Sequence, residues 1–190
     1  MVWYRLNNLE KILRLFCMYH QRRTKLSTGH VQIYYGAGRG KTNAALGNAL
    51  RTAGKGKSVY VVQFLKGKGE DDIKKYCNRL EPELKFFCFE RAEGYYDELS
   101  AEEQEEEKIN MKNGLNFAKK VLVTGECDML ILDEVLGLVD NQIVSVEDLK
   151  NLVQAKEDEV ELIFTGRVLD DAIRPLADEI YNIVAEKCNG

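Results

Sequence analysis

The sequence predicts an α/β fold in which helices flank a mostly parallel sheet. Short apolar segments rich in β-branched and aromatic residues alternate along the chain with segments of helical periodicity. Several of the apolar segments are nearly continuous, as expected for strands that are covered on both faces. The 190 residues, 45% of them apolar, are sufficient for one domain with its own core. We expect this domain over residues 26–190, preceded by an arm over residues 1–25.

The arm has the pattern of an amphipathic helix. Apolar side chains recur at three- and four-residue steps between residues 3 and 19. The arm is also basic, since six lysine or arginine residues against one glutamate give a net charge of +5. Three interpretations stay open: a helix packed on its own domain, an upstream extension with little role, and a mobile arm that covers a ligand or a partner subunit.

The sequence at the start of the domain predicts a strand, a glycine-rich turn and a helix, in that order. The helix is rich in alanine and leucine, and Gly54 is its expected C-cap. Two further β-prone segments follow, with a polar loop between them. The expected elements are a strand over 31–35, a helix over 41–53, a strand over 59–65, a loop over 66–72 and a strand over 84–89.

The second half is marked by two helix starts. Ser100 and Glu103 form a capping box, and the acidic run from Glu102 to Glu107 lies in the first turns, where negative charge suits the helix dipole. We interpret this run as a solvated face and not as a metal site. The expected elements are a long helix after Ser100, a strand over 129–132, a helix after Ser145, a strand over 160–165, a short helix over 169–177 interrupted by Pro175, and a last strand over 180–185.

The composition argues against several classes of protein. A net charge of −4 disfavours a protein that coats nucleic acid. Five cysteines without a C-x-x-C pair, and only two histidines, disfavour a zinc site and a disulfide scaffold. Reduced thiols indicate a cytoplasmic protein. No apolar run approaches the ~18 residues of a membrane-spanning helix, so we expect no membrane span.

The glycine-rich turn has the composition of a phosphate-binding loop. It reads Gly36-Ala37-Gly38-Arg39-Gly40-Lys41-Thr42, one residue tighter than the usual G-x-x-x-x-G-K-[ST]. Alternate glycines let the backbone turn N–H groups inward, and the helix that follows adds positive charge at its N-terminus. The lysine reaches phosphates as a point charge, and the threonine hydroxyl holds Mg²⁺. This loop, with Asn43 after it, is the predicted binding site of a nucleoside triphosphate.

A second nucleotide signal is the strand Met129-Leu130-Ile131-Leu132 with Asp133 and Glu134 at its end, which has the form of a Walker B strand. Ligands of open α/β sheets bind at the carboxyl ends of the strands, so these carboxylates are expected near the loop, where either can hold magnesium. An ordinary strand with a charged end is the alternative.

Arg167 follows the next strand and is compatible with a phosphate contact or with an ion pair to a nearby aspartate.

Together these motifs resemble the P-loop type of ATP:corrinoid adenosyltransferases, the enzymes that make adenosylcobalamin. The family's loop, Gly-Asn-Gly-Lys-Gly-Lys-Thr, has the spacing of residues 36–42. The most distinctive match is Val61-Val62-Gln63-Phe64-Leu65-Lys66-Gly67, which is no generic nucleotide-binding motif. The resemblance covers residues 31–187, and its other segments are 44–47, 51–57, 132–134 and 164–167.

The resemblance implies a RecA-like P-loop NTPase fold, with ATP, Mg²⁺ and a reduced corrinoid as ligands. In the family's reaction Co(I) attacks C5′ of the ribose and triphosphate leaves, so the nucleophile belongs to the substrate and no Cys/His or Ser/His pair is needed. The protein holds the triphosphate and stabilises its charge. The resemblance assigns that role to Lys41, Thr42, Glu134 and the loop N–H groups from Gly38 to Thr42, and metal binding to Thr42, Glu134 and Asp133.

The corrinoid side departs from the family's pattern. The family has a Gly-Phe-x-Trp segment whose rings press on the lower face of the corrinoid, whereas this chain has Glu93-Gly94-Tyr95-Tyr96-Asp97. Tyr95 and Tyr96 are therefore the candidate corrinoid contacts, with an ordinary core or surface pair as the alternative. The resemblance also implies a homodimer, a flavoprotein electron donor and an N-terminal helix that closes over the active site, a role that suits residues 3–19.

Two other functions stay open. A small-molecule kinase or ATPase of the P-loop class would use Asp133 or Glu134 to activate an acceptor or position a water, and would release ADP and phosphate. A non-catalytic nucleotide or corrinoid binder would give no product. An adenosyltransferase is distinguished from both because it releases triphosphate.

Overall fold

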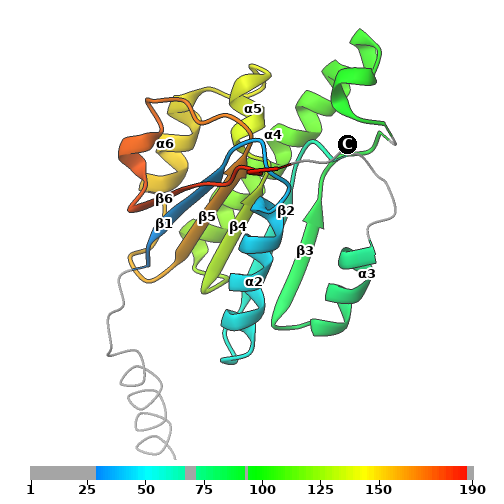
Figure 1. Ribbon diagram of the computed structural model, residues 1–190. Coiled ribbons are helices and arrows are strands. Elements are labelled where there is room, and N and C mark those ends of the chain that lie inside the picture. The colour runs from blue at the N-terminus through cyan, green and yellow to red at the C-terminus, as the bar shows by residue number, and fades with distance from the viewer. Residues whose placement is uncertain (1–28, 67–71, 93, 188–190) are drawn as a thin grey trace, which may run out of the picture.

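The computed structural model describes residues 29–66, 72–92 and 94–187, so the predicted arm over residues 1–25 lies outside the described residues (Figure 1). Within them the chain forms one parallel sheet of six strands in the order β3-β2-β4-β5-β1-β6, which confirms the predicted α/β class. The strands are β1 (Val31–Tyr35), β2 (Val59–Gln63), β3 (Leu84–Cys88), β4 (Met129–Asp133), β5 (Glu161–Gly166) and β6 (Glu179–Asn182).

Helices cover both faces of this sheet (Figure 1). Met129 and Ile131 of β4 pack on the side of α2, whereas Leu130 and Leu132 join the core under α4, α5 and α6. This alternation follows from the two-residue period of a strand. Among the described residues, no helix has both the length and the apolar character needed to cross a membrane. The helices are α2 (Lys41–Ala53), α3 (Asp72–Cys77), α4 (Ala101–Thr124), α5 (Leu136–Asp140) and α6 (Val146–Gln154), with 3₁₀ turns η1 (Asn78–Leu80), η2 (Tyr96–Glu98) and η3 (Arg174–Leu176).

The local signals for helix ends are confirmed. α2 has its predicted bounds, and the Gly54 N–H donates to the Leu50 carbonyl at 2.9 Å. Ser100 forms the predicted capping box with Glu103, and Ser145 forms a second one at the start of α6. These caps satisfy N–H groups that would otherwise have no partner in the first turn.

Three predicted boundaries are wrong by two or more residues, and each has a physical reason. The expected helix over 169–177 is only the three-residue turn η3, because Pro175 lacks the N–H that a longer helix needs. β2 ends at Gln63 because Leu65 adopts a left-handed conformation with φ 59°. β6 ends at Asn182 because the next residue turns its carbonyl toward the glycine-rich loop. The short helices α3 and α5 were not predicted.

Candidate active site

Four strands deliver polar residues to one edge of the sheet. β1 leads into the loop of residues 36–42, which we call the phosphate loop, while β2, β4 and β5 bring Gln63, Asp133 and Thr165. The strands are parallel, so these residues meet at the carboxyl edge, which is the upper edge of the sheet in Figure 1. Because β5 lies between β1 and β4, Thr165 stands between the phosphate loop and the carboxylates.

Lys41 folds back into the phosphate loop. Its Nζ donates to the carbonyls of Gly36 and Gly38, at 2.9 Å each, and the residue is only 6% exposed. The first turn of α2 contains no acidic residue, so the positive end of the helix is not offset there. The loop therefore holds a fixed cation at a helix N-terminus, which is an arrangement that favours anions. Of the other predicted loop residues, Ala37 and Arg39 are exposed, as is Asn43 in α2.

The segment after β6 packs against the phosphate loop. The Gly38 N–H donates to the Ile183 carbonyl at 2.9 Å, so this N–H, which the resemblance assigned to the phosphates, has a protein acceptor. Gly36 has φ +119°, and a Cβ there would lie 2.5 Å from both Asn182 Oδ1 and Ile183 O. Glycine at position 36 is thus required by the close approach of the protein's own C-terminal segment.

Asp133 is 1% exposed and is surrounded by donors. Its Oδ1 accepts from Thr42 Oγ1 at 2.9 Å and from Thr165 Oγ1 at 2.7 Å. Its Oδ2 accepts from Gln63 Nε2 at 3.3 Å and from Lys66 Nζ, with which it forms an ion pair. The Thr42 contact joins the two nucleotide motifs that the sequence predicted, although 91 residues separate them.

The Thr42 hydroxyl and the Asp133 carboxylate fit Mg²⁺, since both are hard oxygen ligands within 2.9 Å of one another. The described residues contain no cluster of three or more His, Cys, Asp and Glu side chains that could hold a metal ion. Two protein oxygens are enough for Mg²⁺, because this ion keeps much of its water and also binds substrate phosphates.

Lys66 lies at the centre of this site, and the sequence did not single it out. Its Nζ contacts both Asp133 and Thr42 Oγ1, the latter at 3.0 Å. The left-handed residue Leu65 turns the chain just before it, and the Lys66 N–H donates to Glu90 Oε2 at 3.0 Å. The lysine backbone is therefore anchored beside the carboxyl end of β2, while its side chain remains 31% exposed.

Glu134 lies beside Asp133 in a left-handed conformation, with φ 61°. Its N–H donates to Thr165 Oγ1 at 2.8 Å. Burial raises the pKa of the Glu134 carboxyl, as does the neighbouring charge of Asp133, while Lys41, Lys66 and Arg167 oppose the shift. A left-handed residue other than glycine costs ~1–2 kcal/mol, and such strain concentrates at functional sites.

Arg167 is exposed at the end of β5, and its carbonyl accepts from the Gly36 N–H at 3.1 Å. Asp171, one of the two aspartates considered as its partner, pairs with Arg174 at 2.8 Å. The positive charge of Arg167 opposes the rise in the pKa of Glu134, so its side chain lies within electrostatic range of the site.

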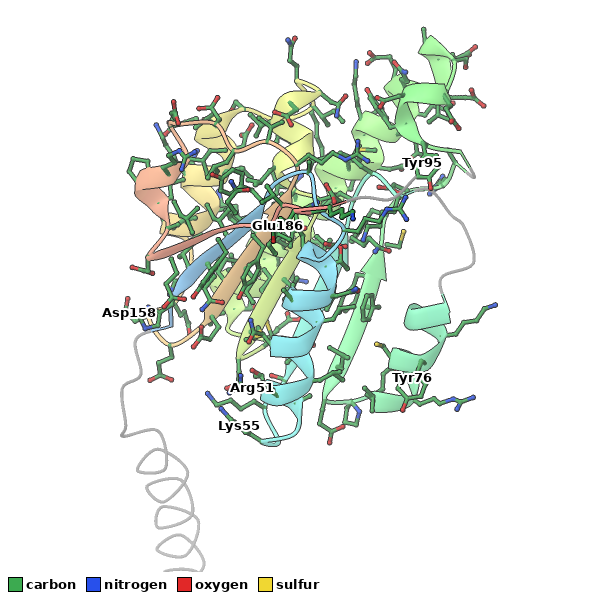
Figure 2. All side chains as sticks on the ribbon, viewed as in Figure 1. Arg51, Lys55, Tyr76, Tyr95, Asp158 and Glu186 are labelled. Carbon is green, nitrogen blue, oxygen red and sulfur yellow. The ribbon has the colours of Figure 1, made fainter. Side chains whose placement is uncertain are left out.

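The two candidate corrinoid contacts differ sharply in exposure. Tyr95 is 63% exposed, whereas Tyr96 is 8% exposed and packs in the core under α4. Figure 2 shows Tyr95 beside the first part of α4, at the end of the molecule where the phosphate loop lies. Tyr95 therefore presents its ring to the surface, and Tyr96 is a core residue.

The interpretation of residues 102–107 as a solvated face is wrong for Glu107, which is 4% exposed. Its Oε1 accepts from the backbone N–H groups of Arg91 and Ala92, at 2.9 Å each, and from Asn110 Nδ2 at 3.3 Å. Its Oε2 has no hydrogen-bond partner among the described residues, and Glu107 lines a small cavity together with Gly94 and Tyr96. Glu107 thus anchors to α4 the segment that leads from β3 to Tyr95.

Residues 27–189 match the family of the ATP:corrinoid adenosyltransferase BtuR/CobO/CobP. The chain belongs to this family. The corrinoid adenosyltransferase of Escherichia coli K12 is 30% identical over 155 residues, which are 82% of this chain and 76% of that protein. The corrinoid adenosyltransferase CobA of Salmonella typhimurium LT2 is 32% identical, with the same coverage. Family membership confirms the resemblance and the prediction of a transferase enzyme.

The fold has a wider structural relative. The crystal structure of a KaiC-like protein from Pyrococcus horikoshii OT3 aligns with a TM-score of 0.53 and 18% sequence identity, over 83% of this chain and 74% of the other. At this level of identity the likeness concerns the fold alone, and it agrees with the predicted RecA-like P-loop NTPase class.

Proposed function

We propose that this enzyme transfers the 5′-deoxyadenosyl group of ATP to the cobalt of a reduced corrinoid and releases triphosphate. The observation that carries the proposal is the contact between Thr42 and Asp133, in a chain of the corrinoid adenosyltransferase family. It joins a phosphate loop to a carboxylate, as nucleotide binding requires. The corrinoid chemistry is supported by the relatives named corrinoid adenosyltransferases, which the chain matches over most of its length.

The proposed reaction is a displacement at carbon and not a phosphoryl transfer. Co(I) supplies the electron pair of the new Co–C bond, and both electrons of the C5′–O bond leave with the triphosphate. No proton is transferred, so the enzyme needs no general base. It must bind the leaving group and stabilise its growing charge, a task for which Lys41 and the N-terminus of α2 are arranged. A Mg²⁺ ion, held by Thr42 and Asp133 and with Glu134 nearby, would neutralise further charge on the phosphates.

The corrinoid is expected on the side of Tyr95, whose exposed ring is available for an apolar contact with the macrocycle. Tyr96 would act from the core, by holding this segment in place. Residues 3–19 of the arm over 1–25 are proposed as a lid over the site, outside a catalytic domain of residues 26–190. A homodimer and a flavoprotein electron donor complete the proposal by analogy with the family.

The test is an anaerobic assay of the purified protein with ATP, Mg²⁺, cob(I)alamin and a strong chemical reductant. The expected result is a light-sensitive Co–C product with one triphosphate released for each adenosyl group. Release of ADP and phosphate would instead establish a kinase or ATPase. Tight binding of ATP and corrinoid without any product would establish a non-catalytic binder, and either result would overturn the proposal.

A further inference from the structure

The Lys66 ammonium occupies the position of a cation in the proposed metal site. It contacts the two groups that we assign to Mg²⁺, Thr42 Oγ1 at 3.0 Å and the Asp133 carboxylate through an ion pair. The Thr42 hydroxyl donates to Asp133 Oδ1 at 2.9 Å, so its lone pairs face outward, and one of them accepts from Lys66. A metal ion bound to the other lone pair of Thr42 Oγ1 would lie next to the Lys66 ammonium on the same oxygen, and the two positive charges would repel one another.

We infer that Lys66 and the metal ion exclude one another at this position, and that Lys66 moves onto the triphosphate when the metal enters. This inference rests on the proposed function, because it assumes that Mg·ATP is the nucleotide substrate. A divalent cation beside Asp133 would repel the ammonium and would also replace it as the counter-ion of the buried carboxylate. Asp133 therefore has a counter-ion in both states, which is Lys66 before the metal binds and the metal ion afterwards.

The backbone of Lys66 is held in place, whereas its side chain is able to move. The backbone of Lys66 is held by the bond from its N–H to Glu90 Oε2 at 3.0 Å, directly after the left-handed residue Leu65. Its side chain is 31% exposed, so it has a path through solvent. Lys41, in contrast, is 6% exposed and bound to two carbonyls of its own loop. Of these two lysines, Lys41 is the fixed phosphate ligand and Lys66 is the one that can change partners.

The first measurement is the affinity of the nucleotide-free protein for Mn²⁺, read by electron paramagnetic resonance. In Lys66→Met we expect the affinity to rise by about tenfold or more, because the metal no longer competes with an ion pair. Lys66→Arg, which keeps the charge, should bind Mn²⁺ as weakly as the wild type. Lys55→Met is the matched control for the loss of one positive charge, since Lys55 is exposed near the far end of α2 (Figure 2). Equal or weaker Mn²⁺ binding by Lys66→Met would overturn the exclusion.

The second measurement is the affinity for Mg·ATP by calorimetry. The gain in metal affinity of Lys66→Met acts here as well, but this variant also lacks a phosphate ligand. Its affinity for Mg·ATP should therefore rise about tenfold less than its affinity for Mn²⁺, whereas Lys55→Met should change in neither. Equal gains in the two affinities of Lys66→Met would overturn the movement onto the triphosphate. If Lys66→Met folds poorly, Lys66→Gln retains a donor to Asp133 without the charge and is measured in the same way. Neither measurement contains corrinoid or reductant, so a failure of the proposed adenosyl transfer would leave both results interpretable.

Discussion

Asp133 and Glu107 are both almost fully buried, at 1% and 4% exposure, but the donors around them differ in kind. Asp133 accepts from four side chains, and one of these is the flexible ammonium of Lys66. Glu107 accepts from two backbone N–H groups and the side chain of Asn110. Side chains can exchange partners by rotation, whereas backbone donors move only with their whole segment.

This difference separates two tasks. In the proposed exchange, a metal ion takes the place of the Lys66 ammonium beside Asp133, and only a side chain has to move. The surroundings of Glu107 fix the segment of Arg91 and Ala92, and with it the approach to Tyr95. We therefore expect changes at Asp133 to affect chemistry more than stability, and changes at Glu107 to affect stability and corrinoid binding more than ATP binding.

The largest expected effect is that of Asp133→Asn on turnover. The amide retains the shape of the carboxylate but loses the charge that would hold Mg²⁺ and balance Lys66, so we expect adenosyl transfer to fall by about 100- to 1000-fold. The measurement is the initial rate with saturating substrates, with Asp140→Asn as a control at an exposed position at the end of α5. A rate within about threefold of the wild type would remove Asp133 from the proposed chemistry.

Glu107→Ala tests the other half of the comparison. It leaves the Arg91 and Ala92 N–H groups without their acceptor, so we expect a loss of about 2–4 kcal/mol in the free energy of unfolding. Urea denaturation measures this loss, and Glu106→Ala is the control because Glu106 is exposed on the same helix. The affinity for ATP should not change. Equal stabilities of the two variants would show that Glu107 anchors nothing.

Tyr95→Ala asks whether the anchored segment serves the corrinoid. Loss of the exposed ring should raise the KM for cob(I)alamin by about tenfold and leave the KM for ATP unchanged. Tyr76→Ala is a close match, since Tyr76 is 62% exposed against 63% for Tyr95 and lies at the opposite end of the molecule (Figure 2). The same rise in KM in both variants, or none in Tyr95→Ala, would place the corrinoid elsewhere.

The sequence predicted those parts of the fold and site that depend on local patterns. The phosphate loop, the bounds of α2 and the cap at Ser100 each follow from neighbouring residues and the period of a helix. The Asp133 carboxylate was found in the same way, since four apolar residues before two acids are typical of a strand that ends at a nucleotide site. Family resemblance then supplied the chemistry that the motifs alone left open.

The sequence did not predict contacts between distant segments. Glu107 reads as one more residue of an acidic run, because its burial depends on the path of the chain after β3. Lys66 lies in the most distinctive segment of the chain, but its contact with Asp133 needs the pairing of β2 with β4. Gly36 belongs to a motif that the sequence shows clearly. Only the structure shows that the close approach of Asn182 and Ile183 also requires a glycine at this position.

The smallest expected effect concerns the pH dependence of stability at Glu134. Because burial and Asp133 raise the pKa of this carboxyl in the folded state, its ionisation favours the unfolded chain. Stability is therefore highest below the usual pKa of a glutamate and falls as the pH rises through the higher folded-state pKa.

Glu134→Gln should then raise the Tm by about 2–4 °C at about pH 8, with the gain vanishing near about pH 4. Thermal denaturation with a chelator present checks this against Glu106→Gln. An equal rise in Tm at both pH values would mean that the glutamine acts through packing. No rise in Tm at the higher pH would mean that the charge of Glu134 is already balanced by Lys41, Lys66 and Arg167.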